Sequence, residues 1–166
     1  MTRAKLLLPL LLLPFAACSG VKTYELGLHG APNLNPNEEG QANAVRVKVM
    51  CLVGEESAKA FEAAAFDDLW ADLIKAQNIV LNGPAQSQFV PPRDARVAVT
   101  LKEVPLAVTH IGVVGLFNAP LQGKDRCIIG RDAFGSLELW LHDNVIDTAP
   151  PTPAPTPAPA PKQPGS

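Results

Sequence analysis

The sequence lacks a cluster of basic residues and any hydrophobic run long enough to cross a bilayer. Its 14 lysines and arginines are outnumbered by 16 aspartates and glutamates, a balance that argues against binding to a nucleic-acid backbone. The longest apolar run, Leu6 to Ala17, covers 12 residues and contains two prolines. As a helix it would measure about 18 Å against a hydrocarbon core of roughly 30 Å. We therefore expect no membrane-spanning helix.

Motifs of catalysis and metal binding are also missing. The three histidines, His29, His110 and His142, show no metal-ligand spacing, and there is no Cys-x-x-Cys. Neither the Gly-x-Ser-x-Gly elbow nor a Gly-rich nucleotide-binding motif occurs. These absences predict a protein that is not an enzyme and holds no metal. An envelope enzyme with a three-histidine site assembled by folding is the alternative.

What the sequence does contain begins with an export signal at residues 1–17. Arg3 and Lys5 precede the apolar run, and small residues close it. The segment Phe15-Ala16-Ala17-Cys18 resembles a bacterial lipobox, in which the cysteine receives diacylglycerol and an N-acyl chain and becomes the first residue of the mature protein. Two or three acyl chains anchor a protein essentially permanently. The resemblance implies lipidation of Cys18 and a tether over residues 18–21.

Ser19 resembles the residue that follows the cysteine in lipoproteins sorted to the outer membrane. This likeness implies a lipid-anchored protein on the periplasmic face of that membrane, without a cofactor other than its lipid. Cleavage after Ala17 and release of a soluble periplasmic protein is the alternative.

Export places the two remaining cysteines in an oxidising compartment. Cys51 and Cys127 are the right number for one disulfide, which would close a loop of 75 residues. Cys51 is in phase with Val45, Val47 and Val49 and should point to the interior. Two separate free thiols are the alternative, because spacing alone cannot show that the sulfurs meet.

Between residues 22 and 148 the dominant pattern is alternation with period two, which is typical of half-buried strands. One segment breaks it: Phe66, Leu69, Trp70, Leu73 and Ile74 lie at helical spacing. Several strands with one or two helices inserted after the second favour a mainly β fold, a two-sheet antiparallel sandwich. The expected strands lie around Tyr24–Leu28, Val45–Val49, Ile79–Leu81, Val97–Lys102, Val108–Phe117 (a central strand) and Leu137–His142.

Residues 149–166 are rich in proline, alanine and threonine. Alternating prolines prevent regular backbone hydrogen bonding, and small side chains give nothing to bury. We expect a disordered, extended tail. A spacer that contacts the cell wall is the alternative function for it.

The order of motifs along the domain resembles a known family, the outer-membrane lipoproteins of type VI secretion (TssJ or SciN). The likeness is carried by Leu34 to Gly40, Ala44-Val45-Arg46-Val47, Phe61, Ala65 to Leu69, and Ile111 to Phe117. It implies a transthyretin-like sandwich and a periplasmic partner, the carboxy-terminal domain of the large inner-membrane component TssM. It also implies that the protein anchors the secretion membrane complex without catalysing a reaction.

The family binds through loops at one end of the sandwich, and residues 33–43 form the longest candidate here. We predict partner contacts at Asn35, Pro36, Glu38 and Glu39, because exposed carboxylates can select a partner by charge. Leu34 should instead be buried. A plain connecting turn is the alternative for this loop, and a lipid-anchored ligand-binding or adhesion module is the alternative function for the whole protein.

Overall fold

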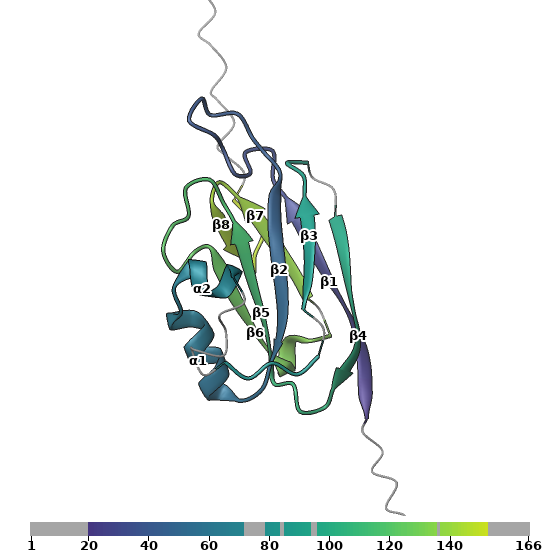
Figure 1. Ribbon diagram of the computed structural model, residues 1–166. Coiled ribbons are helices and arrows are strands. Elements are labelled where there is room, and N and C mark those ends of the chain that lie inside the picture. The colour runs from purple at the N-terminus through teal and green to yellow at the C-terminus, as the bar shows by residue number, and fades with distance from the viewer. Residues whose placement is uncertain (1–19, 72–78, 84, 94–95, 136, 153–166) are drawn as a thin grey trace, which may run out of the picture.

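Two facing four-stranded sheets form the core of the protein, as the computed structural model shows (Figure 1). The structure describes residues 20–71, 79–83, 85–93, 96–135 and 137–152. The first sheet has the order β4-β1-β7-β8 and the second β3-β2-β5-β6. The strands are β1 (Val21–Gly30), β2 (Val45–Leu52), β3 (Gln86–Val90), β4 (Arg96–Pro105), β5 (His110–Leu116), β6 (Arg126–Gly130), β7 (Leu137–His142) and β8 (Val145–Asp147).

The predicted two-sheet sandwich is thus confirmed, with one difference in its pairing. Strand β1 pairs antiparallel with β4 but parallel with β7. All the other paired strands run antiparallel. The parallel pair is possible because β2 to β6 lie between β1 and β7 in the chain, which provides the long connection that parallel strands require.

Alternating residues of the predicted strands fill the space between the sheets. Leu26 and Leu28 of β1 meet Leu139 and Leu141 of β7, and all four are at most 1% exposed. Cys51 is buried among the valines of β2, as its phase predicts. The expectation of a central strand at residues 108–117 is also confirmed, because β5 lies between β2 and β6.

Two short helices cover the outer face of the second sheet. The helices α1 (Glu55–Ala63) and α2 (Phe66–Trp70) bury a second apolar cluster against β2 and β5, centred on Met50, Phe61 and Leu69. The start of the predicted amphipathic helix is therefore confirmed, and Leu73 and Ile74 lie outside the described residues.

This helical cover makes one detail of the strand prediction wrong. Alternation indicated that Lys48 faces solvent, whereas it is 7% exposed. Its Nζ donates hydrogen bonds to the carbonyls of Leu69 (3.2 Å) and Trp70 (3.4 Å) at the end of α2. The cation is placed where a helix carboxy-terminus concentrates negative partial charge.

The strand predicted at residues 79–81 is reduced to a single bridge between Leu81 and Leu52. Three strands were not predicted: β3, β6 and β8. Their sequences lack clear alternation, since β3 exposes most of its residues at a sheet edge and β8 is only three residues long. These segments form strands because they pair with β2, β5 and β7, and not because of a pattern in their own sequences.

Of the two alternatives left open for the cysteines, the structure shows separate thiols. Both are free thiols. Cys51 lies opposite Ile111 and Cys127 opposite Val113, so β5 stands between their strands. Two strand spacings, about 9.5 Å, exceed the roughly 7 Å that a disulfide can span between Cα atoms. Burial raises the pKa of the Cys51 thiol and, together with the Asp147 carboxylate, raises the pKa of Cys127 to about 11.

The ends of the sandwich carry different features. The first described residues, Gly20 and Val21, lie at one end, and the loop of residues 31–44 projects from the other (Figure 1). The described carboxy-terminal segment, residues 148–152, lies beside Asn33 at the loop end. Cys18, Ser19 and most of the proline-rich tail lie outside the described residues. Among the described helices, none is both long enough and apolar enough to pass through a membrane.

Candidate interaction site

The β1–β2 loop, residues 31–44, is held to the sandwich by two neighbouring residues. Leu34 is fully buried in the main core, as predicted. Asn35 is 3% exposed and adopts a left-handed backbone conformation with φ 49°, which asparagine tolerates better than most residues. Its Nδ2 donates to the Ala44 carbonyl (3.0 Å), and its Oδ1 accepts from the Asn118 N–H (2.7 Å). Asn35 therefore holds the loop in place from the interior. The predicted partner contact at Asn35 is wrong, because its side chain is buried.

The tip of the loop is organised by a second asparagine. The Asn37 Oδ1 accepts hydrogen bonds from the N–H groups of Glu39 (3.1 Å) and Gln41 (2.8 Å). Gly40 completes the turn with φ 77°, where a residue without a side chain is favoured. Glu38 and Glu39 are exposed at this tip, and Pro36 is half-buried. The loop is thus pre-ordered and presents two carboxylates outward.

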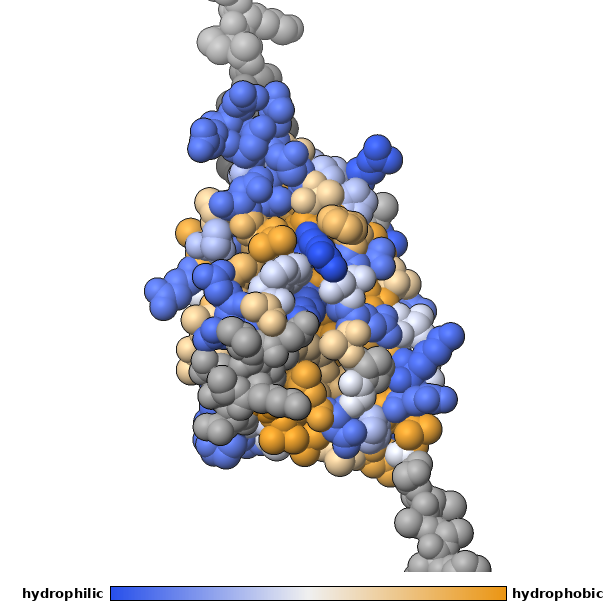
Figure 2. Space-filling model, in the orientation of Figure 1, coloured by the Kyte–Doolittle hydropathy of each residue, from blue (hydrophilic) through white to orange (hydrophobic). Residues whose placement is uncertain are grey.

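Directly below the loop, the outer face of the second sheet carries an apolar patch around one arginine. We name it the Arg46 patch, and it consists of Arg46, Phe66, Trp70, Phe89 and Leu116. Figure 2 shows hydrophobic surface on this face beneath the polar loop. The Arg46 guanidinium carbon lies 5.7 Å from the Trp70 ring centroid and 6.0 Å from that of Phe89.

Strand pairing assembles this patch from distant parts of the chain. Phe89 and Leu116 both lie opposite Arg46 in the register of the sheet. Phe89 is 64% exposed and Leu116 is 40% exposed. The Trp70 ring stacks on Phe66 within α2. Since aromatic residues and arginine dominate the energetics of protein interfaces, the loop and the patch together form a candidate surface for a protein partner.

The sequence prediction missed the Arg46 patch. Helical spacing predicts that Trp70 packs on a core, and this is confirmed because the ring is partly buried against the second apolar cluster. Alternation predicts only that Arg46 faces solvent. The sequence feature that points to the patch is the alternation of β2, which places Arg46 on the outer face of the sheet. No sequence signal places Phe89 beside it, because the sequence of β3 lacks the alternation of a strand.

The three histidines are dispersed, and each has its own carboxylate. His29 contacts Glu138 at 2.7 Å, His110 contacts Glu55 at 3.3 Å, and His142 contacts Asp147 at 2.8 Å. Within the described parts of the chain, no group of three or more histidines, cysteines, aspartates and glutamates is placed to hold a metal ion.

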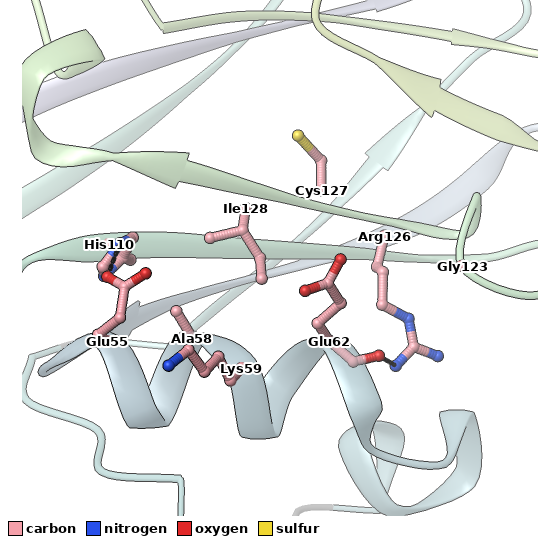
Figure 3. A pocket seen from close by; sticks show the side chains of 9 residues that line it. All are labelled: Glu55, Ala58, Lys59, Glu62, His110, Gly123, Arg126, Cys127 and Ile128. Atoms are coloured by element: carbon pink, nitrogen blue, oxygen red, sulfur yellow. Dashed lines mark hydrogen bonds and ion pairs between the residues drawn. The ribbon is translucent and has the colours of Figure 1, made fainter.

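A cavity between α1 and the second sheet is lined by charged residues (Figure 3). One of these residues, Arg126, attaches α1 to the sheet. The volume of the cavity is about 270 Å³, and Glu55, Glu62, His110 and Arg126 help to line it. Arg126 donates to the carbonyl oxygens of Phe61, Glu62 and Ala64 at the end of α1. The cavity is smaller than typical small-molecule sites, and its buried cation is already bound to the helix.

His142 gives the loop end a dependence on pH. Burial disfavours its charged form, but hydrogen bonds with Asp147 and Asp143 outweigh burial and raise its pKa. The stabilisation is therefore fully present below the ordinary pKa of about 6.5 and is lost as pH rises through the raised value. Because both carboxylates are about half exposed, we expect a contribution of only a few tenths of a kcal/mol.

We predict that His142→Gln removes this part of the pH dependence. In the unsubstituted protein, the contribution of His142 to the free energy of unfolding should fall between about pH 6 and pH 8. Urea unfolding at several pH values, with and without the substitution, measures the difference. Equal slopes in the two proteins would contradict the assignment.

The same arrangement of strands occurs in solved structures of secretion proteins. A chain in the structure of a "Type VI membrane complex" aligns with a TM-score of 0.65 and 22% identity over 79% of this chain and 100% of its own length. A chain in the structure described as "T6SS protein TssM C-terminal domain (869-1107) from EAEC" aligns with a TM-score of 0.62 and 22% identity, over 78% of this chain and 99% of its own. The lipoprotein TssJ1 from Pseudomonas aeruginosa aligns with a TM-score of 0.60 and 18% identity, over 81% and 100%.

At these identities the structural likeness establishes the fold. Among curated proteins, none matches the sequence. The family follows from the sequence itself. Residues 22–144 match the family T6SS-SciN, described as type VI secretion lipoprotein, VasD, EvfM, TssJ. That match spans the whole sandwich except its last strand, and the chain therefore belongs to the type VI secretion lipoproteins.

Proposed function

We propose that this lipoprotein anchors a type VI secretion membrane complex at the periplasmic face of the outer membrane. In this proposal, diacylglycerol and an N-acyl chain on Cys18 fix the protein in the bilayer, and Ser19 permits its sorting to the outer membrane. The sandwich then binds the periplasmic carboxy-terminal domain of a large, TssM-like inner-membrane component. The role is mechanical and requires no catalysis.

The observation that carries this proposal is the separation of the two ends of the sandwich. Strand β1 begins three residues after Cys18, and its ten residues end at the base of the loop. At about 3.3 Å per residue, the strand spans roughly 33 Å. A lipid on Cys18 would therefore place the loop and the Arg46 patch well away from the bilayer, where an inner-membrane partner can reach them.

The chemistry of the loop end fits a protein partner of this kind. It combines two exposed carboxylates, Glu38 and Glu39, with an arginine between aromatic rings. Charges at the rim of an interface guide association, and aromatic anchors at its centre hold the complex. The fold is shared with chains in structures described as a TssM carboxy-terminal domain and as a type VI membrane complex.

The test is co-purification of the full-length, detergent-extracted lipoprotein with the periplasmic carboxy-terminal domain of the TssM-like protein from the same cells. We expect a stable complex. Cys18→Ser should abolish labelled-palmitate incorporation and outer-membrane localisation while leaving binding in solution intact, because β1 begins at the end of the sandwich opposite the loop.

Two results would contradict the proposal. One is palmitate incorporation that persists in Cys18→Ser, which would place the lipid elsewhere. The other is a folded, acylated lipoprotein that does not bind the periplasmic domain.

A further inference from the structure

The end of the sandwich opposite the loop carries exposed hydrophobic side chains beside the first described residues. The Leu106 N–H donates to the Gly20 carbonyl at 3.2 Å, and Pro105 pairs with Val21. The side chains of Val21 and Leu106 are nevertheless 51% and 46% exposed. Two large apolar residues thus lie uncovered where the chain enters the fold.

Two more apolar residues extend this surface. Val80 is 55% exposed and Leu81 is 37% exposed. The Val53 N–H donates to the Val80 carbonyl at 3.0 Å, and Leu81 bridges Leu52 at the end of β2. The turn that contains Leu106 connects back to the same place, because the Thr109 N–H donates to the Leu52 carbonyl at 3.0 Å. Figure 2 shows hydrophobic surface at this end.

We infer that this apolar end, made of Val21, Val80, Leu81 and Leu106, rests against the lipid bilayer as a second membrane contact beside the acyl chains. The inference depends on the proposed lipidation of Cys18. Only two peptide units separate the Cys18 Cα from the Gly20 Cα, a reach of at most about 7 Å. A tether this short holds Val21 and Leu106 at the headgroups, within the shallow depth of about 5–10 Å at which peripheral proteins bury apolar side chains.

The surrounding charges suit this placement. The Arg131 guanidinium donates to the Leu106 and Val108 carbonyls and is exposed beside them, where a lipid phosphate would lie. The acidic residues Glu55 and Glu56 are exposed at the start of α1, just before Ser57, whose hydroxyl accepts a hydrogen bond from the Val80 N–H at 3.0 Å. They therefore lie at the Val80 edge of the apolar end, where we place them in water at the rim of the contact. The sandwich would therefore rest on the end where β1 begins and β4 finishes, and point the loop into the periplasm.

The test places a tryptophan at each end of the full-length, acylated protein. Leu106→Trp probes the proposed contact, and Leu121→Trp is the matched control, because Leu121 is 52% exposed in the connection from β5 to β6 at the loop end. Each variant is reconstituted in vesicles of phosphatidylethanolamine and phosphatidylglycerol, with or without brominated acyl chains. The unsubstituted protein supplies the background from Trp70 and Trp140.

We expect brominated lipid to quench the tryptophan at position 106 at least about twofold more than the tryptophan at position 121, because only the former reaches the acyl boundary. Vesicle flotation is measured on the same samples. Flotation with equal quenching at the two positions would overturn the membrane contact and leave the proposed function intact. If the unsubstituted protein does not float with the vesicles and its Cys18 carries no acyl chain, the proposed anchoring is overturned, and the membrane contact with it.

Discussion

Replacing Arg126 with methionine is expected to lower the free energy of unfolding by about 3–5 kcal/mol, since it breaks a buried ion pair and leaves its partner uncompensated. The Arg126 side chain is 7% exposed and that of Asp125 is 2% exposed. The two form a bidentate pair, with Nε to Oδ1 and Nη2 to Oδ2 both at 3.1 Å.

The same guanidinium also caps α1. Its Nη1 donates to the carbonyls of Phe61 at 3.1 Å and Ala64 at 2.6 Å. Carbonyl groups at a helix carboxy-terminus have no partner within the helix and need an external donor. Methionine fills similar space but donates nothing, so the substitution leaves buried carbonyls and a buried carboxylate without their donor.

Urea unfolding followed by circular dichroism, in a Cys18→Ser background, measures this effect. Lys124→Met is the matched control, because Lys124 is exposed two residues earlier, and it should change stability by less than about 0.5 kcal/mol. Adding Asp125→Asn to Arg126→Met should recover at least about 1 kcal/mol, because the two sites are coupled. An Arg126→Met variant as stable as the control would show that the pair does not hold the helix.

The double substitution Arg46→Ala with Phe89→Ala is expected to weaken binding to the TssM-like periplasmic domain by about 100-fold or more. Buried aromatic and arginine residues at an interface each contribute on the order of 2 kcal/mol when truncated. The unbound protein should remain folded, because both side chains are exposed. Calorimetric titration with the isolated partner domain measures the change in affinity.

The matched control is Thr23→Ala with Thr100→Ala, two exposed threonines on strands of the other sheet. It should leave affinity within about twofold. Charge reversal of Glu38 and Glu39 is expected to have a smaller effect that depends on salt, because exposed rim charges act mainly on association. Unchanged affinity in the Arg46/Phe89 variant would remove the Arg46 patch from the interface.

Local pattern was sufficient for most of the sandwich. Period-two alternation predicts β1, β2, β4 and β7, and a run that is apolar on both faces predicts β5 as a central strand. Alternation could not show that the outer face of β2 is also covered, so Lys48 was assigned to solvent although it lies under α2. That cover depends on a helix more than 15 residues away in sequence.

The loop shows the same division between local and tertiary information. Its length and its glycine and asparagine content marked a turn at residues 33–43, and Leu34 is buried as expected. The separate roles of Asn35 and Glu38 could not be inferred, since Asn35 is held by a hydrogen bond from Asn118, 83 residues later. The sequence predicts a partner contact at both residues, but only Glu38 is exposed, whereas Asn35 is buried.

Short patterns along the chain, which need no tertiary partner, are sufficient to predict the family and the two-sheet architecture. Tertiary structure alone decided that Cys51 and Cys127 stand on either side of β5 as free thiols. It also decided that Arg46, Trp70 and Phe89 share one surface and that the loop lies at the end of β1 away from Val21. The physical reason is that strand register and helix docking bring together residues with no local relation in the chain.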